Sequence, residues 1–277
     1  TKPSGGYAYY KDGVLTLNNF VAAKLVRYYE RYLEVELIGE NKIGAIADYY
    51  YWDTTSNNYY TGLEFRGDGD LEFDEYPMNI LKAADVQNVD KENVQKLFNE
   101  DCVKMLLVNA KGDVVEECTK DFTKFKAFTM NVKDELYKRD NGQDFVLPII
   151  VINNGKEDVN VIQLQGAGLW GPIWGYIGMT SDFQNVVGVV FDHKSETPGL
   201  GAEITTPRFR DQFKGKTIFS GGEFVSIDVV KGGVANLASD LQKHSVDAIS
   251  GGTITSNGVN NMIENVLGSY LPYIEKQ

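Results

Sequence analysis

The apolar segments of this chain have the lengths of strands and of helices, and they follow one another without regular alternation. Strand-like runs are expected at 103–108, 114–115, 148–152, 161–164, 186–191 and 224–230. Helical patterns are expected at 78–84, 91–98, 206–213 and from about Ser256 onward. Parallel α/β folds place a helix after nearly every strand. The irregular order therefore predicts an α+β fold.

Turn and cap residues agree with these boundaries. Lys111-Gly112-Asp113 and Asn153-Asn154-Gly155 are expected as turns, and Asp90 is expected to cap the second helix. Pro207 after Thr206 is typical of a first helical position. The last helix is predicted from an apolar stripe at helical spacing: Val259, Met262, Ile263, Val266, Leu267 and Tyr270.

The composition narrows the function classes. The 277 residues carry 27 Lys and Arg against 39 Asp and Glu, a net charge of −12. This acidic balance argues against general affinity for nucleic acid or anionic lipid, because both would be repelled. No apolar run reaches the roughly 18 residues that a membrane-spanning helix needs. The 43% hydrophobic content is that of a globular chain.

Composition also divides the chain into two parts. Residues 1–76 are rich in tyrosine, with clusters at 49–52 and 59–60, and the sequence assigns them no role. Such aromatics can bind sugars or stack on rings, but they more often build strands and cover a core. Residues 77–277 carry the segments with recognisable chemistry, so a domain boundary is expected near Pro77.

Cysteine and histidine are too scarce for a metal centre. Cys102 and Cys118 either pair across a hairpin or remain separate thiols, and the sequence leaves both possibilities open. His193 and His244 are expected on the surface or with satisfied hydrogen bonds. No metal site and no catalytic side chain are predicted.

The most informative segment runs from Asp247 to Gly258 and reads DAISGGTITSNG. Its glycines allow close backbone approach, and the N–H groups of the following helix start favour a phosphate. The alternative is a glycine turn followed by a Ser or Thr cap. It matches neither a Walker A pattern nor G-x-G-x-x-G.

Two further segments combine glycine with apolar or polar side chains. Residues 166–176, GAGLWGPIWGY, would present a surface to a flat ring or form a bulged strand with core tryptophans. Residues 196–202, ETPGLGA, follow a strand as a tight loop whose polar groups could reach the edge of a heterocycle.

Together, these three segments resemble the signatures of the bacterial FMN-binding domain. Asp-x-x-Ser-Gly-x-Thr resembles its flavinylation motif, in which a flavin transferase esterifies FMN phosphate to a threonine, here Thr253. The combination is most similar to the NqrC family of the sodium-pumping NADH:quinone oxidoreductase (Nqr), with the RnfG family of the Rnf complex as a related alternative. The resemblance covers residues 77–277 and implies a twisted, mainly antiparallel sheet flanked by helices.

The resemblance also implies roles for individual residues. Thr253 would carry covalent FMN as a phosphoester, and the flavinylation motif would comprise Asp247, Ser250, Gly251, Gly252 and Thr253. Ser250, Gly251, Thr255 and Ser256 would surround the phosphate. The isoalloxazine ring would contact Leu169, Trp170, Thr197, Leu200 and Gly201, and Glu196 would reach its pyrimidine edge or serve only as a loop carboxylate.

Function and location are likewise implied by the family. The chain would be an electron carrier in a sodium-translocating NADH:ubiquinone reductase of the inner membrane, with a soluble domain facing the periplasm. Its partners would be other Nqr subunits and, during maturation, the transferase. The family has an N-terminal membrane anchor that this chain lacks, and we expect it to have been removed. Gly252 departs from the alanine usual before the acceptor, and this smaller residue should fit the transferase. The alternative class is a non-enzymatic extracytoplasmic binding module.

Overall fold

The computed structural model describes the strands between residues 7 and 73 as backbone, and residues 75–277 apart from 123 and 124. Side chains are described from Tyr76 onward, Thr129 excepted, so the predicted roles of the aromatics at 49–52 and 59–60 lie outside the described residues. The chain divides into two compact units, Thr1–Met78 and Asn79–Gln277.

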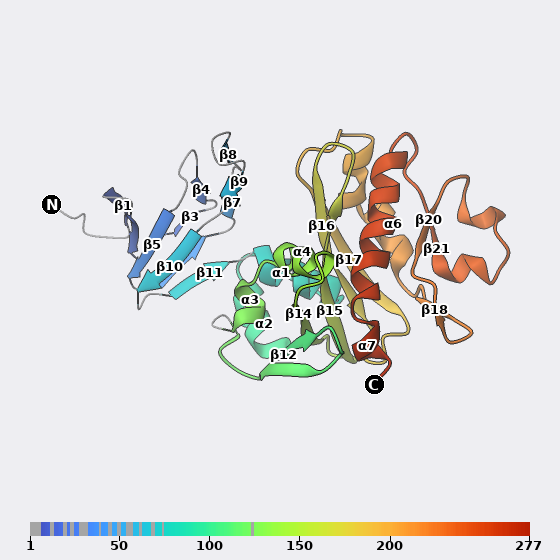
Figure 1. Cartoon of the computed structure of the whole chain (residues 1–277), viewed down its shortest axis with the longest axis horizontal. Helices are drawn as coiled ribbons and strands as arrows, with labels where there is room; N and C mark the ends of the chain where they lie inside the picture. Colours follow the sequence, from blue (N-terminus) through green and yellow to red (C-terminus); the bar gives the residue numbers. More distant parts are fainter. Residues whose placement is uncertain are drawn as a thin grey trace. The chain divides into compact units, whose positions relative to one another are not determined.

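Between residues 7 and 73 the described residues form short strands, many of them paired in parallel (Figure 1). Strand β2 pairs with β5 and β5 with β10, while β3 pairs with β6 and β6 with β11. Parallel pairing of successive strands is typical of solenoids. The strands are β1 (Tyr7–Lys11), β2 (Val14–Asn18), β3 (Val21–Ala22), β4 (Leu25–Arg27), β5 (Leu33–Ile38), β6 (Glu40–Ile43), β7 (Ile46–Asp48), β8 (Tyr51–Asp53), β9 (Asn58–Tyr60), β10 (Leu63–Gly67) and β11 (Asp70–Phe73).

The second unit is built on a six-stranded sheet of order β13-β12-β14-β15-β16-β17, in which every neighbouring pair is antiparallel. Its strands are β12 (Cys102–Asn109), β13 (Val114–Cys118), β14 (Val146–Asn153), β15 (Asp158–Ala167), β16 (Pro172–Met179) and β17 (Val186–His193). Helices cover this sheet, so the predicted α+β class and its mainly antiparallel sheet are confirmed.

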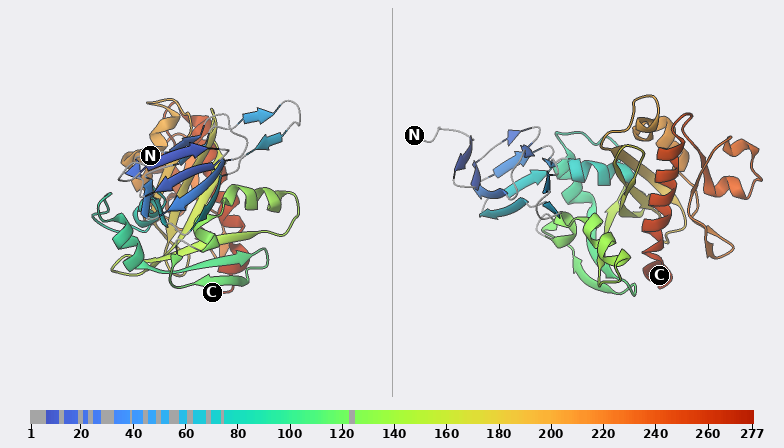
Figure 2. Two further views of the ribbon diagram at one scale, coloured as in Figure 1. Left: turned by 90° about the vertical axis from the view of Figure 1, so that its left-hand side faces the viewer. Right: turned by 45° about the horizontal axis from the view of Figure 1, so that its top comes forward.

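Helices lie on both faces of this sheet (Figures 1 and 2). The helix α1 (Glu75–Ala83) ends over β16 and β17, where a Cβ added to Gly178 or Gly188 would lie 2.2 or 2.8 Å from the carbonyl oxygen of Ala83. On the opposite face, α6 (Thr253–Gly268) packs against β15, and a Cβ added to Gly166 would lie 2.7 Å from Cβ of Met262. Because both faces are covered, a central strand such as β14 is apolar along nearly its whole length.

The remaining helices and strands are short. The helices are α2 (Val94–Asp101), α3 (Lys126–Thr129), α4 (Val132–Asp140), α5 (Pro207–Arg210) and α7 (Leu271–Ile274). The strands β18 (Phe219–Ser220) and β19 (Glu223–Phe224) form a hairpin, and β20 (Asp228–Val230) pairs in parallel with β21 (Ser245–Asp247).

Several predicted boundaries need correction. The helix predicted at 78–84 begins earlier, at Glu75, and the helix predicted at 206–213 is α5 followed by a short 3-10 helix over Asp211–Phe213. The strand predicted at 224–230 is two strands, because Ser226 adopts a φ of 60° that ends β19 before β20 begins. The helix predicted at 91–98 begins at Val94, although the Asp90 carboxylate does accept the N–H groups of Glu92 and Asn93. The last helix begins at Thr253, three residues before the predicted Ser256.

The predicted stripe of the last helix is confirmed. All six of its apolar positions are buried against the sheet. The hydroxyl of Tyr270 donates to the carbonyl oxygen of Pro148 at 2.8 Å. Pro148 is tolerated in this interior strand because β14 pairs with β15 only from Ile150 onward. The C-terminal end of α6 is thereby joined to the part of β14 that β15 leaves uncovered.

Candidate functional site

The three glycine-containing segments meet at one end of the second unit. Residues 168–171 form the turn between β15 and β16, and residues 194–200 leave the end of β17. His193 at that end pairs with Ile173 at the start of β16, so both segments lie at the same end of the sheet. The helix α6 begins there as well, because Gly258 packs against the carbonyl oxygen of Ala167.

The buried side chain of Glu196 connects these segments through hydrogen bonds. Its side chain is 5% exposed, and Oε1 accepts the backbone N–H of Trp170 at 2.8 Å. Oε2 accepts the hydroxyl of Thr255 at 2.6 Å. The N–H of Glu196 donates to Nδ1 of His193 at 3.2 Å, which further anchors the loop to the end of β17.

Two glycines make room for this carboxylate. A Cβ on Gly168 would lie 2.5 Å from Oε1 of Glu196, and a Cβ on Gly201 would lie 2.3 Å from Oε2 and 2.4 Å from Oγ1 of Thr255. Both positions therefore require glycine. The predicted ring-contact residue Gly201 is buried, and its lack of a Cβ leaves room for the bond between Glu196 and Thr255.

Two hydrogen bonds between nearby residues close the turn before α6. The N–H of Gly252 donates to the carbonyl oxygen of Ile249 at 3.0 Å, and the N–H of Ile249 donates to Oγ of Ser256 at 3.0 Å. Gly251 adopts a φ of 75°, a conformation that favours glycine. The turn delivers Thr253 to the first position of α6, where it is exposed.

The start of α6 offers backbone donors next to that hydroxyl. The first N–H groups of a helix have no intrahelical acceptor. Within the described part of the chain, the N–H groups of Thr253, Ile254 and Thr255 donate to no other residue. These donors and the positive end of the helix dipole suit an anionic group beside Thr253.

Large apolar side chains surround this helix start and remain exposed. Trp170 is 63% exposed and Ile254 is 56% exposed, and Leu169 and Leu200 are also exposed. Leu200 lies against the turn, since a Cβ on Gly251 would come within 2.7 Å of its Cδ2. Burying a flat ring against such side chains would be favourable. The observed residues therefore fit a flavin whose phosphate is held at the start of α6.

Asp247 lies at the opposite end of the same segment. Its Oδ1 accepts the N–H of Val234 at 2.6 Å, and its N–H donates to Oε1 of Gln212 at 2.8 Å. An open cavity of about 830 Å³ adjoins it. Its lining includes Glu203, Arg208, Gln212, Asp247 and Ser250. Asp247 thus orders the chain before the turn and remains accessible to a partner.

The predicted site residues separate into an outer and an inner group. The exposed ones are Leu169, Trp170, Thr197, Leu200, Asp247, Ser250, Gly251 and Thr253. The buried ones are Glu196, Gly201, Gly252, Thr255 and Ser256. The interpretation of Trp170 as a core side chain is wrong, because the turn after β15 presents it to solvent. Thr255 and Ser256 lie beneath the helix start, with their hydroxyl oxygens bonded to Glu196 and Ile249.

Sequence reasoning missed Gly168, Ile249 and Ile254. The sequence marks Gly168 only as part of a segment, and its contact with Glu196 depends on a residue far along the chain. Ile254 had a usable signal, because it is an apolar residue outside the buried stripe of α6.

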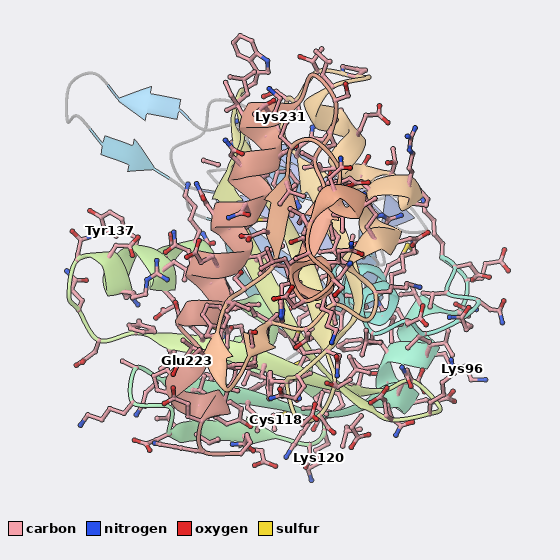
Figure 3. The ribbon with its side chains drawn as sticks, turned by 90° about the vertical axis from the view of Figure 1, so that its right-hand side faces the viewer. Lys96, Cys118, Lys120, Tyr137, Glu223 and Lys231 are labelled. Atoms are coloured by element: carbon pink, nitrogen blue, oxygen red, sulfur yellow. The ribbon has the colours of Figure 1, made fainter. Side chains whose placement is uncertain are left out.

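The histidines and cysteines do not join the site. His193 is bonded to the Glu196 backbone, and Nδ1 of His244 lies 2.7 Å from the carbonyl oxygen of Thr217. Both cysteines are free thiols, and burial raises the pKa of Cys102 to about 12. The Cys118 thiol donates to the carbonyl oxygen of Lys120 near the edge of the sheet (Figure 3). Among the residues described, no group of three metal-binding side chains occurs.

Comparison with known proteins places this site in a family. A family model of the FMN-binding domain matches residues 168–268, which include Trp170, Glu196 and Thr253. NqrC of Haemophilus ducreyi, from the Na(+)-translocating NADH-quinone reductase, is 30% identical over 207 residues, covering 72% of this chain and 78% of that protein. The chain belongs to the NqrC family. The family resemblance seen in the sequence is thereby confirmed.

Solved NqrC structures agree with the assignment. The crystal structure from Parabacteroides distasonis superposes with a TM-score of 0.62 at 37% identity, covering 74% of this chain and 93% of that one. NqrC of Chlamydia muridarum is 39% identical over 125 residues, but the match spans only 39% of its length and 41% of this chain. Among the described residues of this NqrC family member, no helix has the length and hydropathy to cross a membrane.

Proposed function

We propose that this chain is the electron-carrying NqrC subunit of a sodium-translocating NADH:quinone reductase and that it holds FMN as a phosphoester on Thr253. The single observation that carries this proposal is the place of Thr253. Its exposed side chain lies at the first position of a 16-residue helix, beside N–H groups that have no acceptor in the described chain. A phosphate esterified to this hydroxyl would stay at the positive end of the helix.

Each group of residues then has a task. Ser250, Gly251 and the first N–H groups of α6 hold the phosphate, while Thr255 and Ser256 fix the turn from beneath. Leu169, Trp170, Leu200 and Thr197 border the ring. Flavin supplies the redox chemistry, and the protein supplies position and electrostatics. No side chain of the site needs to act as an acid, a base or a nucleophile during electron transfer.

Glu196 supports this arrangement indirectly. Its side chain is buried, and its two oxygens face Trp170 and Thr255 rather than solvent. We therefore assign it to the loop rather than to the ring. Gly201 has a similar indirect role, because it is buried against the same carboxylate.

The maturation step needs a partner enzyme. We propose that a flavin transferase reads Asp247, Ser250, Gly251 and Gly252 and attaches FMN to Thr253. The accessibility of Asp247 and Ser250 beside an open cavity supports docking of another protein there. A Cβ on Gly252 would lie 3.0 Å from Cγ2 of Ile249, so the turn accommodates alanine with a small adjustment.

The remaining assignments concern the complex. Other Nqr subunits would deliver and accept electrons, and sodium transport would belong to the whole assembly at the inner membrane, with this domain on the periplasmic side. Residues 77–277 would form the flavin domain. The names of the relatives favour an Nqr protein over one of the RnfG type.

Intact-mass measurement tests the proposal directly. The chain is co-expressed with a flavin transferase, denatured and weighed. The expected result is a gain equal to FMN minus water that is absent in Thr253→Ala and retained in Asn257→Ala, an exposed control in the same helix. No gain in the unmodified chain, with the transferase active on another substrate, would contradict the proposal and favour a binding module.

A further inference from the structure

One buried carboxylate connects the two halves of the site. Glu196 accepts the Trp170 N–H with one oxygen and the Thr255 hydroxyl with the other, at 2.8 and 2.6 Å. These partners lie 26 and 59 residues away along the chain. Trp170 belongs to the exposed apolar turn, whereas Thr255 lies two positions after Thr253 in α6. The bonds through Glu196 therefore determine the spacing between the apolar turn and the acceptor threonine.

The hydrogen bonds also indicate the charge on Glu196. Both of its side-chain oxygens accept hydrogen bonds, and an ionised carboxylate is an acceptor only. No lysine or arginine within the described residues forms an ion pair with it. The negative charge is thus held by a backbone dipole and a hydroxyl, without a neutralising cation at contact distance. Charges in such interiors act over longer distances than charges in water.

The surrounding glycines show that this bonding is built into the fold. Neither Gly168 nor Gly201 could carry a Cβ without a clash with the carboxylate, since the nearest distances would be 2.5 and 2.3 Å. The clash at Gly201 extends to Oγ1 of Thr255, at 2.4 Å. Three backbone segments have therefore approached one another so closely that no further side-chain carbon fits beside the Glu196 carboxylate at Gly168 or Gly201.

We propose that Glu196 is a positioning residue with an electrostatic effect. It holds the Leu169–Trp170 turn against the first turn of α6, and its buried charge lowers the reduction potential of the flavin at Thr253. Reduction adds negative charge to a group near an existing one, which is unfavourable because water screens a buried carboxylate only weakly. The second statement rests on the proposed function, whereas the first concerns the protein without flavin.

Two substitutions separate position from charge. Glu196→Gln keeps the size of the side chain and an oxygen for the Trp170 N–H, while the Thr255 hydroxyl can rotate to accept from the new amide. This variant removes the charge and preserves the connection. Thr255→Val keeps the charge and the shape but removes the hydroxyl, and Thr255→Ser is its control because it retains the hydroxyl.

Amide hydrogen exchange tests the positioning role without flavin. In the unmodified chain the Trp170 N–H should exchange slowly although its side chain is exposed. Glu196→Ala should accelerate exchange at Trp170 by about tenfold or more, because the N–H loses its acceptor. Glu196→Gln should change it little, because the amide oxygen can still accept this N–H. Thr255→Val should also accelerate it, and Thr255→Ser should not. Unprotected Trp170 N–H in the unmodified chain would overturn the positioning role.

Redox titration tests the charge effect in flavinylated protein. Glu196→Gln should take up covalent FMN and shift the flavin potential in the positive direction. For a one-electron step, a tenfold change in the ratio of oxidised to reduced flavin corresponds to a shift in potential of about 59 mV. Full loading with an unchanged potential would overturn the electrostatic effect. Absence of covalent flavin in the unmodified chain would instead refute the proposed function, and the exchange experiment would still decide the positioning role.

Discussion

The side-chain oxygen of Ser256 accepts the backbone N–H of Ile249 at 3.0 Å, so the first turn of α6 closes the loop that carries Thr253. Ser256 is completely buried. We expect Ser256→Ala to leave the Ile249 N–H without an acceptor, which costs about 1–3 kcal/mol. Urea denaturation should show this loss, and intact mass should show a smaller flavinylated fraction. An unchanged loaded fraction would mean that the turn keeps its shape without this bond.

Alanine substitution of Gly251 and of Gly252, two neighbours in this turn, should change stability by different amounts. Gly251→Ala places a side chain at a φ of 75° and within 2.7 Å of Leu200, so we expect destabilisation of about 1–2 kcal/mol. Gly252→Ala meets no contact shorter than 3.0 Å, with Ile249 at 3.0 Å and the backbone nitrogen of Gly201 at 3.3 Å, and it restores the residue usual in the motif, so stability should change by less than about 1 kcal/mol. Thermal unfolding of the two variants side by side checks the order, and equal losses would contradict it.

The contact between α6 and β15 suggests a second pair of matched glycine-to-alanine variants. A Cβ on Gly258 would lie 2.3 Å from the carbonyl oxygen of Ala167, whereas a Cβ on Gly268 in the same helix would meet nothing within 4 Å. We expect Gly258→Ala to destabilise the domain by about 1–3 kcal/mol, because the helix must move away from the sheet. Gly268→Ala should stabilise it by about 0.5 kcal/mol. Denaturant midpoints measure both, and a tolerated Gly258→Ala would disprove the close contact.

The hydrogen bonds to the buried carboxylate of Glu135 predict that stability depends on pH. Burial raises the pKa of Glu135, but hydrogen bonds from Nζ of Lys138 at 2.7 Å and from the Val146 N–H at 3.0 Å outweigh it and hold the pKa below its ordinary value of 4.5. A carboxyl with a lowered pKa stabilises the fold above its unfolded value, and this contribution is lost as the pH falls through the folded value.

We therefore expect Glu135→Gln to lower the free energy of unfolding by about 1 kcal/mol at neutral pH. As the pH falls below 4.5, the stability of this variant should decrease less than that of the unmodified chain. Urea denaturation across that range measures both. Asp144→Asn, at an exposed position nearby, is the control and should keep the pH profile of the unmodified chain. Parallel pH profiles for Glu135→Gln and the unmodified chain would show that folding does not lower the pKa of Glu135.

The core of the fold could be predicted from periodicity, whereas several boundaries could not. The stripe from Val259 to Tyr270 identifies the buried face of α6, but it predicts the start of the helix too late. Thr253, Ile254 and Thr255 are poor or moderate helix formers, and Ser256 is typical of a cap. In the structure the Ser256 oxygen instead accepts from Ile249, outside the helix. A local pattern does not reveal which donor a hydroxyl will find.

The site could be predicted as three segments, but not as one bonded unit. Motifs identify Thr253 and the two other segments, because glycine and hydroxyl patterns are local. The inward position of Glu196 depends on Trp170 and Thr255, which are distant in sequence. The exposure of Trp170 could not be predicted either, since a tryptophan beside glycines is compatible with a core strand. The parallel strand pairs of the first unit also join distant residues, for example Leu63 with Leu33.

The order of the elements along the chain has a consequence for biosynthesis. All six strands of the sheet precede α6, and a chain grows from its N-terminus. The part of the sheet that α6 covers stays exposed until α6 has left the ribosome, and Thr255 meets Glu196 only then. A transferase that recognises the folded turn before Thr253 would thus act only after α6 has packed against the sheet. Attachment of the cofactor would then report that this packing is complete.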